Sequence, residues 1–217
     1  MIDYQAARTA MVDGQVRPSD VTLYPVIDAM LNVPREVFVP ADKRSVAYMG
    51  EDVALGGGRV EMAPRVLAKM LEELNIQPDE LVLNVGAGLG YSTAVIARLS
   101  EAVVALEENE TMAKEAETML SEQSADNAVV HVAPLVAGAP EHAPYDVIVV
   151  EGGIEVMPDS ILEQLKEGGR IGAIFVDGPD GECRVGVKGP NGISWDAVFD
   201  ATVPVLPGFA AKKEFTF

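Results

Sequence analysis

The sequence is poor in cysteine and histidine, the side chains that bind soft metal ions. Cys183 is the single cysteine, and His131 and His142 are the only two histidines among 217 residues. One cysteine cannot form an internal disulfide, and these three residues cannot supply the four soft ligands of a structural zinc site. Nothing in the sequence supports a carboxylate-bound metal either, so we predict no metal centre.

Basic residues are also scarce. The chain has 16 Lys and Arg against 34 Asp and Glu, which gives a formal net charge of −18 at pH 7. A field of this sign repels nucleic acids and anionic lipid surfaces, because both carry dense negative charge. We therefore expect no nucleic-acid partner and no membrane partner.

Long hydrophobic runs are missing as well. The longest apolar runs, such as 147–150 and 171–176, are far shorter than the roughly 20 residues that a membrane helix needs. The first twenty residues contain no apolar stretch after a basic start, so the sequence shows no signal peptide. We predict a cytoplasmic protein.

The residues that are present favour an α/β fold. After Pro78, short apolar runs alternate with helical patterns, which is typical of a parallel sheet covered on both faces. The expected strands are 81–85, 102–106, 129–133, 146–150 and 170–176, and the expected helices are 91–99, 110–123 and 159–165. This order predicts a doubly wound, Rossmann-like sandwich with a mostly parallel sheet.

The two ends of the chain differ from this alternation. Helical spacing indicates N-terminal helices over 5–16 and 22–31 and a third helix from Pro64, whereas 50–58 reads as a loop that ends in three glycines. Beyond Asp177, glycine-rich turns flank two short apolar runs, which predicts a C-terminal antiparallel hairpin. We divide the chain into an N-terminal elaboration, 1–77, packed on a core, 78–217, as one compact unit.

The most informative segment is a glycine loop after the first expected strand of the core. Glycines there let the backbone turn tightly and let a ligand approach closely. Tyr91 stands where a dinucleotide fingerprint needs its third glycine, so the GxGxG spacing favours a nucleoside without a pyrophosphate. We predict a cofactor-binding set that consists of Gly86, Ala87, Gly88, Gly90 and Glu107.

Glu107 belongs to this set because it ends the neighbouring strand, 17 residues past Gly90. A carboxylate at the tip of that strand is placed to accept hydrogen bonds from both ribose hydroxyls of a nucleoside. Glu108 and Glu110 are the structural alternatives, as acidic residues that open a helix. A plain glycine-rich turn is the alternative for the loop itself.

Four segments together resemble one family. They are VIDAMLNVPREVFVP at 26–40, AYMGEDVALGGGRVEMAP at 47–64, NVGAGLGYSTAVIARL at 84–99 and HAPYDVIVVEGG at 142–153. They look like the protein-L-isoaspartate O-methyltransferases, and the resemblance runs from about Arg8 to Gly169. It implies S-adenosylmethionine as the cofactor of the glycine loop, and repair methylation of isoaspartyl residues in peptides or proteins.

Three segments depart from the family pattern. Val60 and Met62 stand where the family has hydroxyl side chains beside the acceptor carboxylate, and Pro134 begins a Pro-Leu pair in place of Asp-Gly. VEGG at 150–153 replaces a run of small residues. These departures leave two alternatives open: a catalytically degenerate paralogue that serves as a cofactor-binding or assembly module, or a methyltransferase with a different acceptor.

Methyl transfer to a carboxylate needs no general base, because carboxyl groups are ionised at neutral pH. The protein contributes by orienting the two reactants and excluding water. We therefore assign no catalytic residue and predict that Arg59 binds the acceptor carboxylate through its guanidinium. The alternative for Arg59 is a surface ion pair with Glu61, two positions away.

Overall fold

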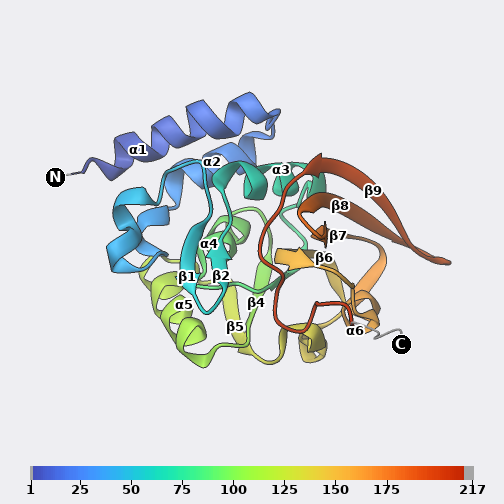
Figure 1. Cartoon of the computed structure of the whole chain (residues 1–217). Helices are drawn as coiled ribbons and strands as arrows, with labels where there is room; N and C mark the ends of the chain where they lie inside the picture. Colours follow the sequence, from blue (N-terminus) through green and yellow to red (C-terminus); the bar gives the residue numbers. More distant parts are fainter. Residues whose placement is uncertain (1, 213–217) are drawn as a thin grey trace, which may run out of the picture.

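The computed structural model describes residues 2–212 and contains a seven-stranded sheet in the order β5-β4-β3-β6-β7-β8-β9 (Figure 1). The neighbouring pairs from β5 to β7 are parallel, and β8 and β9 add an antiparallel hairpin at one edge. This confirms the predicted α/β class and the C-terminal hairpin. The strands are β3 Leu81–Val85, β4 Ala102–Glu107, β5 Ala128–Val132, β6 Tyr145–Ile154, β7 Leu165–Asp177, β8 Asp180–Gly189 and β9 Gly192–Asp200.

The α-helices fall close to their expected places. They are α1 Tyr4–Met11, α2 Tyr24–Asn32, α3 Pro64–Leu74, α4 Tyr91–Ala97, α5 Glu110–Glu122 and α6 Asp159–Glu163. The predicted first helix changes at Met11, where a π-helical turn and a 3-10 turn continue the chain to Ser19. Pro64 opens α3, a position where proline is tolerated because the missing N–H has no intrahelical partner.

The sheet separates two hydrophobic clusters. Side chains alternate between the faces of a strand, so Val82 belongs to one cluster and Leu83, its neighbour, to the other. The first cluster includes buried residues of α2, α3 and α4, and the second includes Ile161 of α6 and Phe209 near the end of the chain. Helices on both faces explain why the central strands read as continuous apolar runs.

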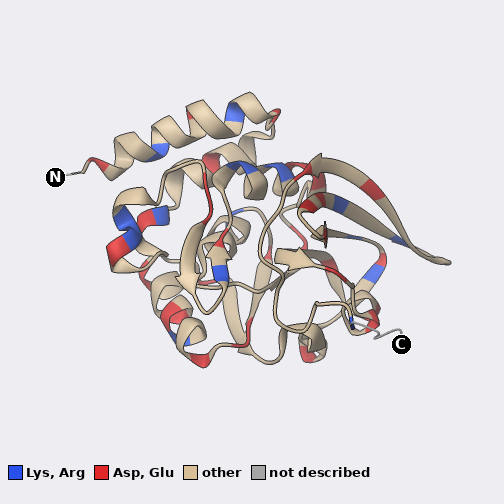
Figure 2. Ribbon diagram, viewed as in Figure 1, with Lys and Arg blue, Asp and Glu red and all other residues tan. Residues whose placement is uncertain are grey.

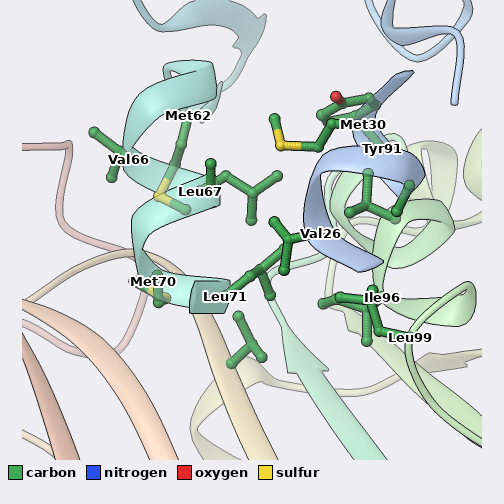
Figure 3. Close-up of a cluster of buried hydrophobic side chains, with 14 of the residues drawn as sticks. Val26, Met30, Met62, Val66, Leu67, Met70, Leu71, Tyr91, Ile96 and Leu99 are labelled. Carbon is green, nitrogen blue, oxygen red and sulfur yellow. The ribbon is translucent and has the colours of Figure 1, made fainter. Parts of the chain in front are cut away.

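The N-terminal segment takes part in the first cluster. Met30 of α2 is fully buried there together with Val82 of β3 and Val95 of α4. Figure 3 shows Met30 close to Tyr91, and Leu67 and Leu71 of α3 extending toward Val26. The division at residue 77 stays a prediction about the organisation of the chain.

The segment predicted as a loop over 50–58 is a small hairpin. Strands β1 Val53–Gly56 and β2 Arg59–Glu61 pair antiparallel as a separate two-stranded sheet. Gly56, Gly57 and Gly58 have φ of 101°, 60° and 79°, so they form the tight turn of this hairpin, where the sequence predicted only a loop. In Figure 1 this hairpin descends from the N-terminal segment toward β4.

Acidic residues are spread over the outer elements, for example along α5 (Figure 2). Among residues 2–212, no helix is long and apolar enough to cross a membrane.

Candidate functional site

The glycine loop lies at the carboxyl end of β3. Gly86, Gly88 and Gly90 have φ of 82°, 57° and 96°, a left-handed region that side-chain-bearing residues rarely adopt. The N–H groups of Gly86 and Ala87 donate to the Leu106 carbonyl at 2.8 and 3.1 Å. These bonds fix the loop against the end of β4, so the predicted glycines form one backbone cradle.

Glu107 lies directly against this cradle. Its side chain is fully buried, and its Oε2 accepts a hydrogen bond from the Gly88 N–H at 2.9 Å. Its Oε1 accepts from the Asn109 N–H at 3.0 Å. Of the two alternatives, Glu110 is exposed on α5, and Glu108 makes only a long contact, 3.4 Å, with the Leu135 N–H. The structure therefore brings Glu107 to the glycine loop.

Arg59 reaches the same place from β2. It is 6% exposed, its Nη1 donates to Glu107 Oε1 at 2.9 Å, and its Nη2 donates to the Gly86 carbonyl at 2.7 Å. The expected alternative, a surface ion pair with Glu61, is wrong because β2 directs both side chains into the protein, where they meet different partners. The guanidinium is a buried counter-ion of Glu107, the carboxylate that the sequence predicts to bind the cofactor.

The hairpin also covers the loop sterically. A Cβ on Gly88 would approach Leu55 Cδ1 to 2.7 Å, and a Cβ on Gly86 would approach Arg59 Nη2 to 3.0 Å. The Glu107 carboxylate accepts hydrogen bonds and the glycine backbone allows close approach, so together they suit the ribose of a nucleoside.

A second buried ion pair joins the other end of β2 to the N-terminal segment. Arg35 is fully buried and donates to Glu61 Oε1 at 3.0 Å, to the Ala47 carbonyl at 2.7 Å and to the Met62 carbonyl at 2.7 Å. Its guanidinium carbon lies 4.8 Å from the centre of the Tyr91 ring. This pair was not predicted from the sequence. The signal that could have indicated it is a charged arginine inside the largely apolar VPREVFVP segment.

Glu151 is a third buried acid beside the loop. It is 5% exposed, and burial raises its pKa to about 8, a rise to which the Glu61 charge adds and which Ser92 and the two arginines oppose. Among residues 2–212, four buried polar atoms in this region have no hydrogen-bond partner: Glu151 Oε1, Arg59 Nε, the Tyr91 hydroxyl and Asn84 Oδ1. Such atoms are costly unless a ligand or water binds them.

The residues that depart from the family pattern have structural surroundings. Met62 is fully buried in the first hydrophobic cluster, and Figure 3 shows its side chain beside Val66 and Met70 of α3. Val60 is half-buried, and Pro134 precedes a 3-10 turn that begins at Leu135. Of the two positions where the family has hydroxyl groups, that of Met62 is therefore part of the core and that of Val60 is half-buried.

The two histidines, which are separate in the sequence, lie together in the fold. Nδ1 of His131, on β5, is 3.2 Å from a carboxylate oxygen of Glu141, and the His131 and His142 rings meet edge to face at 5.7 Å. One ligand atom from each of the three residues lies within 4.8 Å of the others. The sequence predicted no metal centre, because the spacing of these residues gives no sign of this contact.

Comparisons with known proteins identify the family. The model of the family described as protein-L-isoaspartate(D-aspartate) O-methyltransferase (PCMT) matches residues 8–177. The chain belongs to this family. A protein-L-isoaspartate O-methyltransferase of Methylorubrum populi is 35% identical over 210 residues, which cover 95% of this chain and 98% of that protein. One from Roseiflexus castenholzii is 37% identical over 170 residues, 78% of each chain.

Solved structures of the family share the fold. A protein-L-isoaspartate O-methyltransferase structure superposes with a TM-score of 0.80 at 23% identity, over 93% of this chain and 66% of that one. A Plasmodium falciparum structure, which is in complex with S-adenosyl-L-homocysteine, has a TM-score of 0.80 at 20% identity, over 95% of this chain and 99% of that one. These matches confirm the Rossmann-like methyltransferase architecture.

Proposed function

We propose that this chain is an S-adenosylmethionine-dependent methyltransferase that acts on isoaspartyl carboxylates of peptides or proteins. The observation that carries the proposal is the buried carboxylate of Glu107 at the end of β4, which accepts a hydrogen bond from the Gly88 N–H. The match to the family model spans this site. A protein substrate also agrees with the charge of −18, which disfavours nucleic acids. That exclusion and a cytoplasmic location remain predictions.

In this proposal, Gly86, Ala87, Gly88 and Gly90 form the cofactor cradle, and Glu107 accepts the ribose hydroxyls. S-adenosylmethionine, when bound, supplies a methyl group activated by a positive sulfonium. The chain contributes position and shelter: the loop sits under the hairpin, where burial excludes water. No general base is needed, since the acceptor carboxylate is already ionised.

Arg59 is the acceptor-binding residue of this proposal. Its guanidinium is the cation nearest the loop that can hold a carboxylate through two parallel hydrogen bonds. Glu151 assists without repelling the acceptor, because a carboxyl group with a pKa of about 8 is mostly protonated at neutral pH. A protonated carboxyl can donate a hydrogen bond, the role that hydroxyl side chains have in the family pattern.

A second candidate is the degenerate paralogue, a module that binds the cofactor or assembles with other proteins without methyl transfer. It is favoured by Met62, whose burial in the core leaves no polar group at that position toward an acceptor. The two candidates differ in turnover and not in fold.

The test is transfer of labelled methyl groups to an isoaspartyl peptide, with the same peptide containing ordinary aspartate as the substrate control. We expect base-labile methyl esters only on the isoaspartyl peptide. Glu107→Gln should abolish the transfer, and Glu110→Gln, the same change at an exposed site on α5, should leave it intact. Folded protein that binds the cofactor without forming ester would support the second candidate and exclude the first.

A further inference from the structure

We propose that Arg59 is a latch: its ion pair with Glu107 competes with the cofactor, which must displace the guanidinium in order to bind. This inference rests on the proposed function of the glycine loop. Glu107 Oε1 accepts hydrogen bonds from Arg59 Nη1 and from the Asn109 N–H, and Oε2 accepts one from the Gly88 N–H. A carboxylate has about four acceptor positions, so two ribose hydroxyls need the position that Arg59 occupies.

The base of the β1–β2 hairpin is held by side-chain hydrogen bonds, whereas its tip is exposed. At the base, Glu61 is held by Arg35, and Asp52 accepts the Ala63 N–H at 2.8 Å. At the tip, Gly56 to Gly58 are exposed, and the whole two-stranded sheet is separate from the seven-stranded one. A Cβ on any of these three glycines would meet no atom within 4 Å, so the tip has few contacts and can move while the base remains docked.

The latch itself is incompletely satisfied. Arg59 makes two hydrogen bonds, and its buried Nε has no partner among the described residues. A guanidinium has five N–H donors, so burial leaves part of its desolvation cost without compensation. This lowers the free energy needed to withdraw Arg59 below that of a fully bonded pair.

Release of Arg59 couples the two substrates. While it binds Glu107, the guanidinium is unavailable to an acceptor carboxylate, and cofactor binding frees it. The cofactor is therefore expected to bind first and the acceptor second, and each to strengthen the binding of the other, since coupling between sites is reciprocal. Only molecules in which Arg59 has left Glu107 can bind the cofactor. The apparent cofactor affinity is therefore the intrinsic affinity multiplied by the fraction of such molecules.

The test is calorimetric titration with S-adenosylhomocysteine of wild type, Arg59→Met and Arg65→Met. Arg65 is an exposed arginine of α3 and serves as the matched control. We expect Arg59→Met to bind about tenfold or more tightly, because the competitor is gone, and Arg65→Met to bind as wild type does. In the methylation assay, Arg59→Met should raise the KM for the isoaspartyl peptide. Tighter binding of S-adenosylhomocysteine together with a higher KM for the peptide is a combination that loss of a purely structural arginine would not produce.

Equal or weaker binding by folded Arg59→Met would overturn the latch while leaving the proposed function intact. Absence of binding by all variants would overturn both. As a second measurement, amide hydrogen exchange of wild type should become faster over residues 53–61 when the ligand is added. Slower or unchanged exchange there would contradict the latch even if the variant failed to fold.

An independent observation carries a second proposal: the geometry points to a divalent transition-metal site formed by His131, Glu141 and His142. His131 is held in β5, and the other two residues share one 3-10 turn, so a single turn delivers both ligands to the strand. Imidazole and carboxylate ligands suit Zn²⁺ or Ni²⁺ at about 2.0–2.2 Å. The ligand atoms of the three residues lie within 4.8 Å of one another, and the exposed side chains of Glu141 and His142 can shift to bring them into contact with one ion.

Tag-free protein titrated with Ni²⁺ should bind one ion per chain. His131→Ala and His142→Ala should each weaken this binding roughly tenfold or more, and Glu167→Gln, a change at an exposed acid outside the cluster, should not. No saturable binding, or binding that survives both histidine changes, would overturn the metal site.

Discussion

Strand β2 carries two buried arginine–glutamate pairs that look alike and differ in their completeness. Arg35 makes hydrogen bonds to three residues and stacks on Tyr91, whereas Arg59 makes two hydrogen bonds and leaves Nε without a partner among residues 2–212. The first pair joins the N-terminal segment to the base of the hairpin. The second closes the glycine loop. Completeness of hydrogen bonding therefore separates a fixed joint from a displaceable one.

The largest expected effect on stability comes from the Arg35–Glu61 pair. Arg35→Met should lower the free energy of unfolding by about 3 to 5 kcal/mol, because it leaves Glu61 buried without a counter-ion. Arg59→Met should cost less, since Glu107 keeps two backbone N–H donors. Urea unfolding followed by circular dichroism measures both. Equal losses would break the distinction between the two pairs.

The second prediction concerns Glu151, whose pKa responds to both arginines. Because its pKa rises to about 8 in the folded protein, the native state keeps a proton that the unfolded state loses above its ordinary pKa of about 4.5. Stability should therefore fall between about pH 5 and pH 8, by up to about 1.4 kcal/mol per pH unit. Glu151→Gln should remove this part of the slope in unfolding titrations at several pH values. An unchanged slope would show that Glu151 is ionised in the folded state.

The smallest expected effect is on the tip of the hairpin. Leu55→Ala removes the side chain that lies over Gly88, so the closed position loses contact without any change in charge. We expect S-adenosylhomocysteine to bind roughly threefold more tightly, a change of about 0.7 kcal/mol, with little change in stability. Calorimetry on this variant and on Ala54→Gly, a change at the exposed neighbouring position of β1, would show whether the Leu55 side chain over Gly88 limits binding of the ligand.

Much of the fold could be predicted from the sequence, because its signals are local. Apolar runs separated by helical spacing predicted every strand of the parallel core, and Gly86, Gly88 and Gly90 marked the tight turn after β3. Boundaries were less predictable: the 3-10 and π turns after Met11 arise from packing and have no simple pattern.

The site was only partly predictable. Glu107 could be placed from its position at the end of a strand beside the glycine loop. Arg35 and Glu151 could not, because their importance comes from burial and from partners that are distant in the chain. The alternative for Arg59, a surface pair with Glu61, was wrong for the same reason: Glu61 is near in the sequence, but in the fold the partner of Arg59 is Glu107.

By itself, the sequence determined the order of the elements, the cradle of glycines and the acid beside it, since each depends on backbone preference and hydrophobic period. Only the tertiary structure decided which charge neutralises which. It paired Arg59 with Glu107 across 48 positions and brought His131 to Glu141. In a buried, poorly solvated site, such pairing depends on distance in space, and sequence spacing does not encode that distance.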